Sequence, residues 1–582
     1  MPTLSESQSN GTGPKPVVPQ LNEYYKELLS SGKPLFKIPD RYQKEARPYR
    51  VICIGAGASG ILLAYQFQYH MPDVEYCAYE KNPDITGTWY ENTYPGCACD
   101  IPTHAYQFSF APEPNMKKYY SDGPELSLYM KSVAKKFGLM KYFKVNHAVE
   151  RCEWNAEEGK WHVTINNDGR IITDTCDVLI NGSGVLNKWK WPDIPGLNDY
   201  KGALMHSAHW DSSFDYTNKT VAVIGGGSSG VQIVPAIEKD VKHMYVFLRS
   251  PVFIAGAFGA KHAGPNGSNF EYTEDQKKFF RDHPEEHKAY TKAIHQELYK
   301  RFRWLMIDSE EQQEAFDSAR KDMWEKLKSK PELAEKLIPD FSFGCRRLTP
   351  GNGYLEALVK EHVEPTFDHI DRFTSKGIRT VTGKEYEVDA IMCATGFDTS
   401  FRPRFDIIGN NGVNLRDKWD GKTSDGYLGV AVDEFPNYFT VLGPNSPVGH
   451  GSLIPIMEQV SKYILRAVHK MRTSTIKSMV PKHEAVEDFK EFAESYMTRT
   501  AWAGTCSSWF KGGKKNGPVR AMWPGSGNSF MEAIDEVRWE DYDYTYEFKN
   551  RFAYIGTGFT KREMEGGDLS WFINEPHRLT LN

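Results

Sequence analysis

Two segments of this chain repeat one pattern: an apolar run, a glycine-rich turn, a helical run and a second apolar run. The turns lie in "YRVICIGAGASGILLAYQFQ" and "KTVAVIGGGSSGVQIVPAI", and their glycines are Gly55, Gly57 and Gly60, then Gly225, Gly227 and Gly230. Glycines at this spacing between a strand and a helix let the backbone approach a pyrophosphate at the helix N-terminus. The repeat predicts an α/β fold with two dinucleotide-binding (Rossmann-like) domains.

The two units differ at the end of their second strand. The first ends in Glu80, twenty residues after Gly60, and the second ends in Arg249 and Ser250. A carboxylate accepts hydrogen bonds from ribose hydroxyls, whereas a guanidinium pairs with a 2′-phosphate. Because flavoproteins commonly bind their flavin in an N-terminal βαβ unit, we assign FAD to the first site and NADPH to the second. Hydroxyls at the two helix N-termini complete the predicted contacts: Ser59, Ser228 and Ser229.

Composition excludes several other classes. The 582 residues carry a net charge of −5, which does not suggest a nucleic-acid partner. No apolar run approaches the ~20 residues of a membrane span, and the polar N-terminus lacks a signal core. The nine cysteines are scattered, and Cys97 and Cys99 match neither a zinc pattern nor a C-x-x-C redox pair. We therefore expect a cytoplasmic protein with reduced thiols and no metal site; the oligomeric state is left open.

The pattern along the chain predicts four regions. Residues 1–45 form an N-terminal extension, partly disordered, with one short helix in "LNEYYKELLSSG". Residues 46–195 form the first part of the FAD-binding domain. Residues 196–385 form the NADP-binding domain, with a charged helical insertion at about 273–338. Residues 386–582 return to the FAD-binding domain, beginning with the strand in "YEVDAIMCATGF", and include a C-terminal region that caps substrate and NADP.

Two further motifs are long and specific. "YKGALMHSAHWD" contains Tyr200, Gly202, His206, Trp210 and Asp211, and taken alone it reads as a short amphipathic turn. "TGTWYENTYPGCACD" lies in the first domain, and its motif residues are Gly87, Trp89, Tyr94, Pro95, Gly96 and Asp100. Together with the two glycine motifs, over roughly residues 45–530, the chain resembles the flavin-dependent Baeyer–Villiger monooxygenases, the single-chain FAD and NADPH type of class B flavoprotein monooxygenase. Tyr200 replaces the family's phenylalanine, and Thr86 a smaller residue.

The resemblance implies a reaction and several roles. The family uses NADPH and O2 to insert one oxygen beside a ketone carbonyl, through a C4a-peroxyflavin, and the product is an ester or lactone. The "FGCRRLTPGNGYLEAL" segment implies Arg347 as the catalytic cation over the flavin. Asp100 is implied as its catalytic partner, which orients it and also binds the cofactor, and Arg346 is implied to reach the 2′-phosphate beside Arg249. Trp509 is implied to fold over bound NADP. The remaining implied residues are Thr88 and Trp89 for the cofactor, and Gly202, His206 and Trp210 for coupling the two domains.

Three alternatives remain beside this interpretation. An N- or S-oxidising flavin monooxygenase shares both glycine motifs and a similar histidine stretch. A flavin disulfide reductase needs a redox dithiol, which Cys97 and Cys99 are too close together to form easily. A non-catalytic nucleotide-sensing protein would explain the glycines but neither long motif. The identity of the ketone is not readable from the sequence.

Overall fold

The computed structural model describes residues 20–420 and 424–574. The chain divides into two compact units, Ala46–Glu547 and a smaller one made of Met1–Glu45 with Phe548–Asn582. The smaller unit contains α1 (Glu23–Ser30), η10 (Arg551–Ile555), α15 (Lys561–Met564) and α16 (Trp571–Asn574). Within it, backbone N–H groups of Gln43 and Lys44 donate to Phe559 and Tyr554. The helix predicted in the extension is confirmed, but residues after 547 group with that extension and not with the FAD-binding region.

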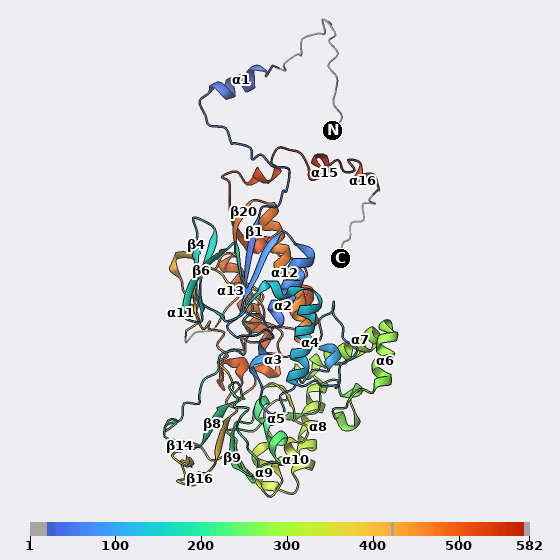
Figure 1. Ribbon diagram of the computed structural model, residues 1–582, viewed down its shortest axis with the longest axis vertical. Coiled ribbons are helices and arrows are strands. Elements are labelled where there is room, and N and C mark those ends of the chain that lie inside the picture. Colours follow the sequence, from blue (N-terminus) through green and yellow to red (C-terminus); the bar gives the residue numbers. More distant parts are fainter. Residues whose placement is uncertain (1–19, 421–423, 575–582) are drawn as a thin grey trace. The chain divides into compact units, whose positions relative to one another are not determined.

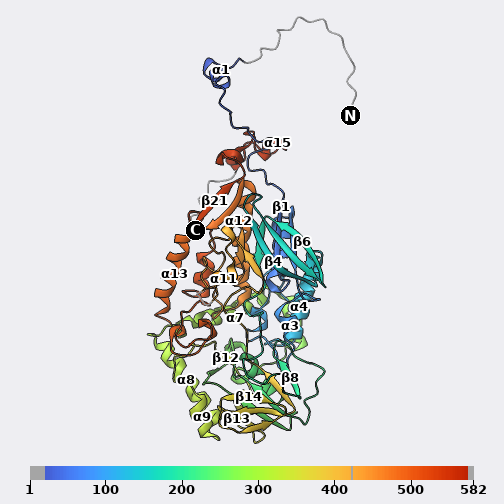
Figure 2. The same cartoon turned by 90° about the vertical axis from the view of Figure 1, so that its left-hand side faces the viewer.

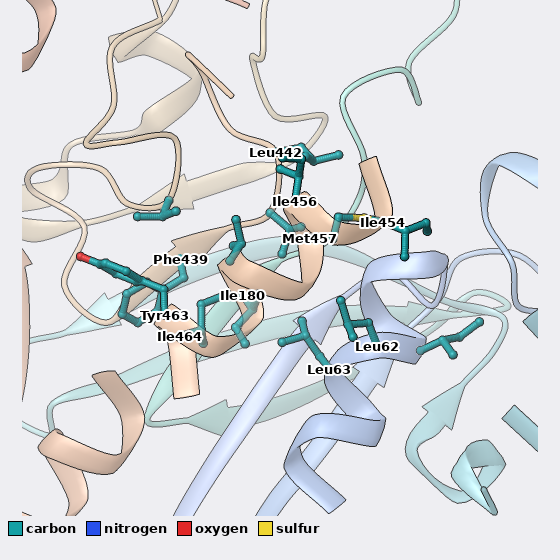
Figure 3. Close-up of a cluster of buried hydrophobic side chains, with 14 of the residues drawn as sticks. Leu62, Leu63, Ile180, Phe439, Leu442, Ile454, Ile456, Met457, Tyr463 and Ile464 are labelled. Carbon is teal, nitrogen blue, oxygen red and sulfur yellow. The ribbon is translucent and has the colours of Figure 1, made fainter. Parts of the chain in front are cut away.

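A five-stranded parallel sheet carries the first glycine motif. Its order is β19-β7-β1-β2-β3, with strands β1 (Tyr49–Ile54), β2 (Val74–Tyr79), β3 (Phe143–Lys144), β7 (Val178–Asn181) and β19 (Tyr438–Thr440). In the register, Val51 of β1 lies beside Val178 of β7. Helices α2 (Ala58–His70) and α12 (Leu453–Thr473) pack together, and Figure 3 shows Leu62 and Leu63 of α2 facing the α12 side chains.

An antiparallel meander flanks this sheet. It consists of β4 (His147–Asn155), β5 (Lys160–Asn167) and β6 (Arg170–Cys176), and β18 (Asp406–Ile408) adds to its edge beside β4. A buried core of its own lies between meander and sheet and includes Trp161 and Trp419. Elsewhere in this domain are α3 (Thr88–Glu91), α4 (Gly123–Lys136), α11 (Leu415–Lys418), α13 (His483–Met497), α14 (Gly527–Ala533) and the antiparallel pair β20 (Ile476–Pro481) and β21 (Tyr542–Tyr546).

A second five-stranded parallel sheet carries the second glycine motif. Its order is β13-β10-β9-β17-β8, with strands β8 (Ala203–His206), β9 (Thr220–Ile224), β10 (His243–Phe247), β13 (Val363–Thr366) and β17 (Ala390–Cys393). The two Rossmann-type domains are thus confirmed. The strand in "YEVDAIMCATGF" is β17, and it pairs with β9 and β8 of this second sheet. The predicted return to the first domain at residue 386 is therefore wrong, and the chain returns at β18 and β19 instead.

Four helices form the predicted insertion in the second domain: α6 (Glu274–Asp282), α7 (Pro284–Lys300), α8 (Glu310–Leu327) and α9 (Pro331–Leu337). The apolar stripe of α7 faces inward, since Ile294 and Leu298 are buried. Smaller elements of the domain are α5 (Ser228–Ile237), α10 (Tyr354–Leu358), β11 (Ile254–Ala255), β12 (Thr349–Pro350) and the antiparallel strands β14 (Ile370–Thr374), β15 (Gly377–Thr380) and β16 (Glu385–Glu387). Figures 1 and 2 show α8 and α9 beside the second sheet.

The cysteines depart from the expectation of reduced thiols. Cys345 and Cys506 form a disulfide, while the other seven cysteines are free and buried. Cys345 lies between α9 and β12, and Cys506 lies in the loop after α13. Spacing gave no signal of this pair because the partners are 161 residues apart. No helix within the described residues is long and apolar enough to cross a membrane.

Candidate active site between the two nucleotide-binding domains

The first glycine turn opens onto a cavity of about 630 Å³. Gly55 has a φ of +105°, and a Cβ there would lie 2.8 Å from the Gly182 carbonyl oxygen. A Cβ on Gly60 would lie 2.3 Å from the carbonyl oxygen of Gly55. Gly57 is different, because a Cβ there meets no chain atom closer than 3.5 Å and Gly57 lines the cavity. The turn is therefore packed on its protein side and open on its cavity side, which fits a pyrophosphate at the start of α2.

Glu80 lies at the end of β2, on the wall of the same cavity, and is 4% exposed. Its Oε2 accepts from the Ala56 N–H at 2.9 Å, and its Oε1 accepts from the Asn82 N–H at 2.9 Å. A carboxylate offers about four acceptor sites. Glu80 is thus held in place by the backbone with acceptor capacity left over, as binding of a ribose requires. Ser59, Thr88 and Trp89 line the cavity too. The donors and shape present fit FAD.

Several cavity residues were not predicted. They come from the end of β7, the loop before β18, the turn after residue 105 and α12, and they include Tyr106, Asn181, Ser183, Arg402, Arg404 and Met457. Asn181 is the last residue of β7, the buried strand that neighbours β1. Ligands bind at the carboxyl ends of such parallel strands, so the segment "INGSG" held a usable signal. The loop before β18 gave none, because only the tertiary fold brings it to the cavity.

The second glycine turn has the same construction. Gly225 has a φ of +121°, and a Cβ there would lie 2.3 Å from the Ala394 carbonyl oxygen. A Cβ on Gly227 would have no chain atom within 4 Å, so this side of the turn is open. Ser228 and Ser229 begin α5, and the Ser228 hydroxyl lies 3.2 Å from that of Thr349. A second nucleotide phosphate fits here on the same physical grounds as the first.

Two arginines lie together at the end of β10. Arg249 is exposed, and the Arg346 Nη1 donates to the Ser250 Oγ and to the Pro251 carbonyl, both at 3.1 Å. Burial, followed by repulsion from Arg249, lowers the pKa of Arg346. Within the described residues neither guanidinium forms an ion pair with a carboxylate. Two adjacent cations without a counter-charge suit a bound phosphate.

Arg347 lines a second, smaller cavity of about 60 Å³, which Arg346 also borders. Its Nη2 donates to the Asp100 Oδ2 at 2.6 Å, and its Nη1 donates to the Val448 carbonyl at 3.3 Å. The negative charge of Asp100 raises the pKa of Arg347. The two neighbouring arginines thus have different partners, Arg346 in the second domain and Arg347 at Asp100 of the first. Apolar and aromatic side chains dominate the wall: Ile101, Phe258, Leu298, Trp304, Leu305, Leu348, Trp502 and Phe510.

The histidine stretch forms β8 at the edge of the second sheet and lines neither cavity. A Cβ on Gly202 would lie 2.2 Å from the Tyr200 hydroxyl, which donates to the Val388 carbonyl at 2.9 Å. His206 is buried, stacks on Trp189 at 4.8 Å, and accepts a hydrogen bond on Nδ1 from the Ala208 N–H at 3.0 Å. Burial lowers its pKa to about 4, so the ring is neutral near pH 7. The stretch therefore packs at the edge of the second domain, and its role in coupling the two domains stays a prediction.

Trp509 also lies outside both cavities. It is half-buried, with its ring 4.8 Å from that of Phe510, whereas Phe510 and Trp502 do line the second cavity. The Cys345–Cys506 disulfide ties this loop to the segment that carries Arg346 and Arg347. That Trp509 folds over bound NADP stays a prediction.

Comparison with known proteins identifies the family. The profile of the flavin-binding monooxygenase-like family matches residues 48–263. The FAD-binding monooxygenase tazF of Aspergillus terreus is 39% identical over 530 residues, which cover 90% of this chain and 94% of that protein. A Baeyer–Villiger monooxygenase of Streptomyces coelicolor is 30% identical over 514 residues, covering 85% of this chain and 92% of that protein.

Solved structures agree with this. Cyclohexanone monooxygenase from Rhodococcus sp. Phi1 bound to NADP+ superposes with a TM-score of 0.74 at 26% identity, covering 86% of this chain and 100% of that one. OTEMO in complex with FAD and NADP gives a TM-score of 0.73 at 25% identity, with the same coverage of both chains. The chain belongs to the flavin-binding monooxygenase-like family, and it is an FAD- and NADP(H)-dependent monooxygenase of flavoprotein class B.

Proposed function

We propose that this monooxygenase carries out Baeyer–Villiger oxidation: with NADPH and O2, it inserts one oxygen beside the carbonyl of a ketone to give an ester or lactone. The observation that carries the proposal is the Arg347–Asp100 pair at the wall of the small apolar cavity. Similarity to the Streptomyces coelicolor Baeyer–Villiger enzyme supports it. When bound, FAD reduced by NADPH supplies the activation of oxygen.

Arg347 suits a reaction in which negative charge develops on a carbonyl oxygen. A guanidinium has five N–H donors, and Arg347 uses two of them, toward Asp100 and Val448. Arg347 lines the cavity, and among the described residues Asp100 is the carboxylate that pairs with it. Because arginine stays charged at any working pH, it can stabilise the oxyanion throughout the reaction. Asp100 orients the guanidinium, so we assign it a positioning role.

The phosphate end of the second site supports NADPH as the reductant. Arg249 and Arg346 would hold the 2′-phosphate, with Ser250 fixing the orientation of Arg346 through the 3.1 Å hydrogen bond to its Oγ. Gly227 and the first residues of α5 would receive the pyrophosphate. His206 and Trp210 would couple the movements of the two domains from the edge of the second sheet, and we assign them no part in proton transfer.

Oxidation of nitrogen or sulfur is the competing reaction within this family. An amine or thioether donates electrons to oxygen, and no negative charge develops on the substrate. A fixed cation beside the substrate is therefore of use to ketone oxidation and of little use to heteroatom oxidation. The placement of Arg347 favours the ketone.

The test is a substrate panel on purified, FAD-loaded protein with NADPH. Cyclic and linear ketones are compared with tertiary amines and thioethers of similar size, and products are identified by mass spectrometry as ester, N-oxide or sulfoxide. We expect ester or lactone as the main product. Heteroatom oxides from the panel with no ester from any ketone would overturn the proposal while leaving the family assignment intact.

A further inference from the structure

The loop before β18 brings a cation into the FAD cavity. Arg404 lines the cavity together with Gly57, Glu80 and Glu91. Its Nε is shielded from solvent and has no hydrogen-bond partner, and over the described part of the chain its guanidinium forms no ion pair. Arg404 as a whole is half-buried, but a shielded donor without a partner costs about 1–3 kcal/mol. Such a group is typical of a site completed by a ligand.

The nearby carboxylates are already engaged. Glu80 accepts from the Ala56 and Asn82 N–H groups, and Glu91 accepts from Lys81 and from the Asn82 side-chain amide. Their negative charges favour the charged form of Arg404, but the effect of burial is larger, so the pKa of Arg404 is lowered. The protein therefore does not itself neutralise this cation.

The backbone that carries Arg404 is well fixed. Asp406, two residues later, pairs with Arg151 of β4 in the register of β18, and its Oδ1 accepts from the Asn414 amide at 3.1 Å and from Arg416 Nη1 at 3.2 Å. Pro403 is buried on the other side. Arg404 is thus placed on the cavity wall by its neighbours and is not a solvent-exposed side chain that happens to fold inward.

We propose that Arg404 binds the adenosine diphosphate half of FAD and supplies a counter-charge to its phosphates. This half carries the negative charges of FAD, and the glycine turn and Glu80 define the same end of the cavity. Glu91 is the last residue of α3, and Gly87 caps the start of that helix. Gly87 lies beside the glycine turn, since a Cβ on Gly57 would be 3.5 Å from Gly87 Cα. The inference rests on FAD occupying the first cavity and is independent of which substrate the enzyme oxidises.

Arg402 provides a matched control. It lines the same cavity two residues away, but its Nε donates to the Arg416 carbonyl at 2.9 Å and its Nη2 lies 3.3 Å from Asp420 Oδ2. Its charge is therefore already compensated by the protein. Removing Arg402 should change FAD affinity much less than removing Arg404.

The experiment measures FAD release from the holoenzyme. Purified wild type, Arg404→Ala, Arg404→Gln and Arg402→Ala are diluted, and free flavin is followed by its fluorescence. We expect both Arg404 variants to raise the dissociation constant of FAD about 10- to 150-fold, the range for a hydrogen bond to a charged group. Arg402→Ala should remain within about threefold of wild type. Raising the salt concentration should weaken FAD binding in wild type more than in Arg404→Gln.

ADP competition locates the contact. If Arg404 binds the ADP half, the variants weaken ADP and FAD alike, and the ratio of the ADP inhibition constant, obtained from displacement at several FAD concentrations, to the FAD dissociation constant stays constant. If FAD weakens while ADP does not, the assignment to the ADP half is wrong. FAD affinity within threefold of wild type in both Arg404 variants would overturn the proposal. Circular dichroism of each variant shows whether it is folded, and Arg404→Gln preserves most of the side-chain volume should the alanine variant fail.

Discussion

Removing Arg347 tests the proposed reaction most directly. In the structure Arg347 Nη2 lies 2.6 Å from Asp100 Oδ2, and the two side chains are 31% and 23% exposed. At an effective dielectric constant of about 20, unit charges at that distance attract by about 6 kcal/mol before desolvation is subtracted. The guanidinium is therefore held rigidly, and its remaining donors need no reorganisation when charge develops on the carbonyl oxygen. Loss of one such preorganised donor group costs about 3–4 kcal/mol in the transition state, or about 10²- to 10³-fold in kcat.

The assay follows two products at once. Arg347→Ala should form no detectable ester, yet it should still consume NADPH slowly and release hydrogen peroxide, because hydride transfer needs stacking and alignment and not this cation. Arg347→Lys keeps the charge but loses the planar fork, so it should retain a trace of ester formation.

Loss of the pair also leaves Asp100 without its partner, which lowers stability for a reason unrelated to catalysis. The double variant Arg347→Ala with Asp100→Asn removes both charges, so it should recover part of the thermal stability and none of the ester. Ester formation near the wild-type rate in Arg347→Ala, with loss in Arg346→Ala, would mean that the two arginines exchange roles. Ester formation in both would refute the electrostatic reasoning altogether.

The other sites give four further predictions. Arg249→Ala should raise the KM for NADPH by about 10- to 150-fold and leave that for NADH nearly unchanged, since a charged hydrogen bond to phosphate is lost; steady-state kinetics showing equal effects on both cofactors would reject the assignment. Gly57→Val should fold, because no chain atom lies closer than 3.5 Å to the added Cβ, but the side chain would project into the FAD cavity, so purified protein should be colourless; a yellow protein places FAD elsewhere. His206→Ala should keep its flavin spectrum but slow turnover by about tenfold or more, equivalent to at least about 1.4 kcal/mol. Unchanged turnover would mean that His206 contributes only to packing and does not couple the domains. Burial lowers the pKa of His206 and of His450 from 6.5 to about 4, so the free energy of unfolding should be highest above pH 6.5 and should fall by up to about 3 kcal/mol for each histidine as the pH drops toward 4. The melting temperature of His206→Phe should fall less over this pH range than that of the wild type. An identical pH dependence would exclude His206 as a contributor.

The sequence predicted the parts of the fold that depend on local pattern. Strand, glycine turn and helix follow from residues within about 30 positions, and the Gly55 and Gly225 turns have the backbone that such motifs require. The Glu80 and Arg249 strand ends also lie where the pattern placed them, at the carboxyl ends of β2 and β10. These features are local, and so periodicity and motif context suffice.

Other features depend on pairing across long separations. β17 is apolar on both faces, so its pattern fits either parallel sheet, and only the register with Val221 of β9 assigns it to the second. The position of Arg404 in the FAD cavity likewise could not be read from the sequence, because it depends on the pairing of β18 with β4. The grouping of residues after 547 with the N-terminal extension likewise had no local signal.

The Cys345–Cys506 disulfide turns part of this chain into a covalent ring. Within the ring the backbone leaves the arginine segment, passes through β17 of the second sheet, and continues through β18 and β19 of the first domain to the loop after α13. A single proteolytic cut between residues 346 and 505 therefore opens the ring without releasing a fragment. On a denaturing gel such nicked protein migrates as one species, and it divides into two only after a reductant breaks the sulfur bridge.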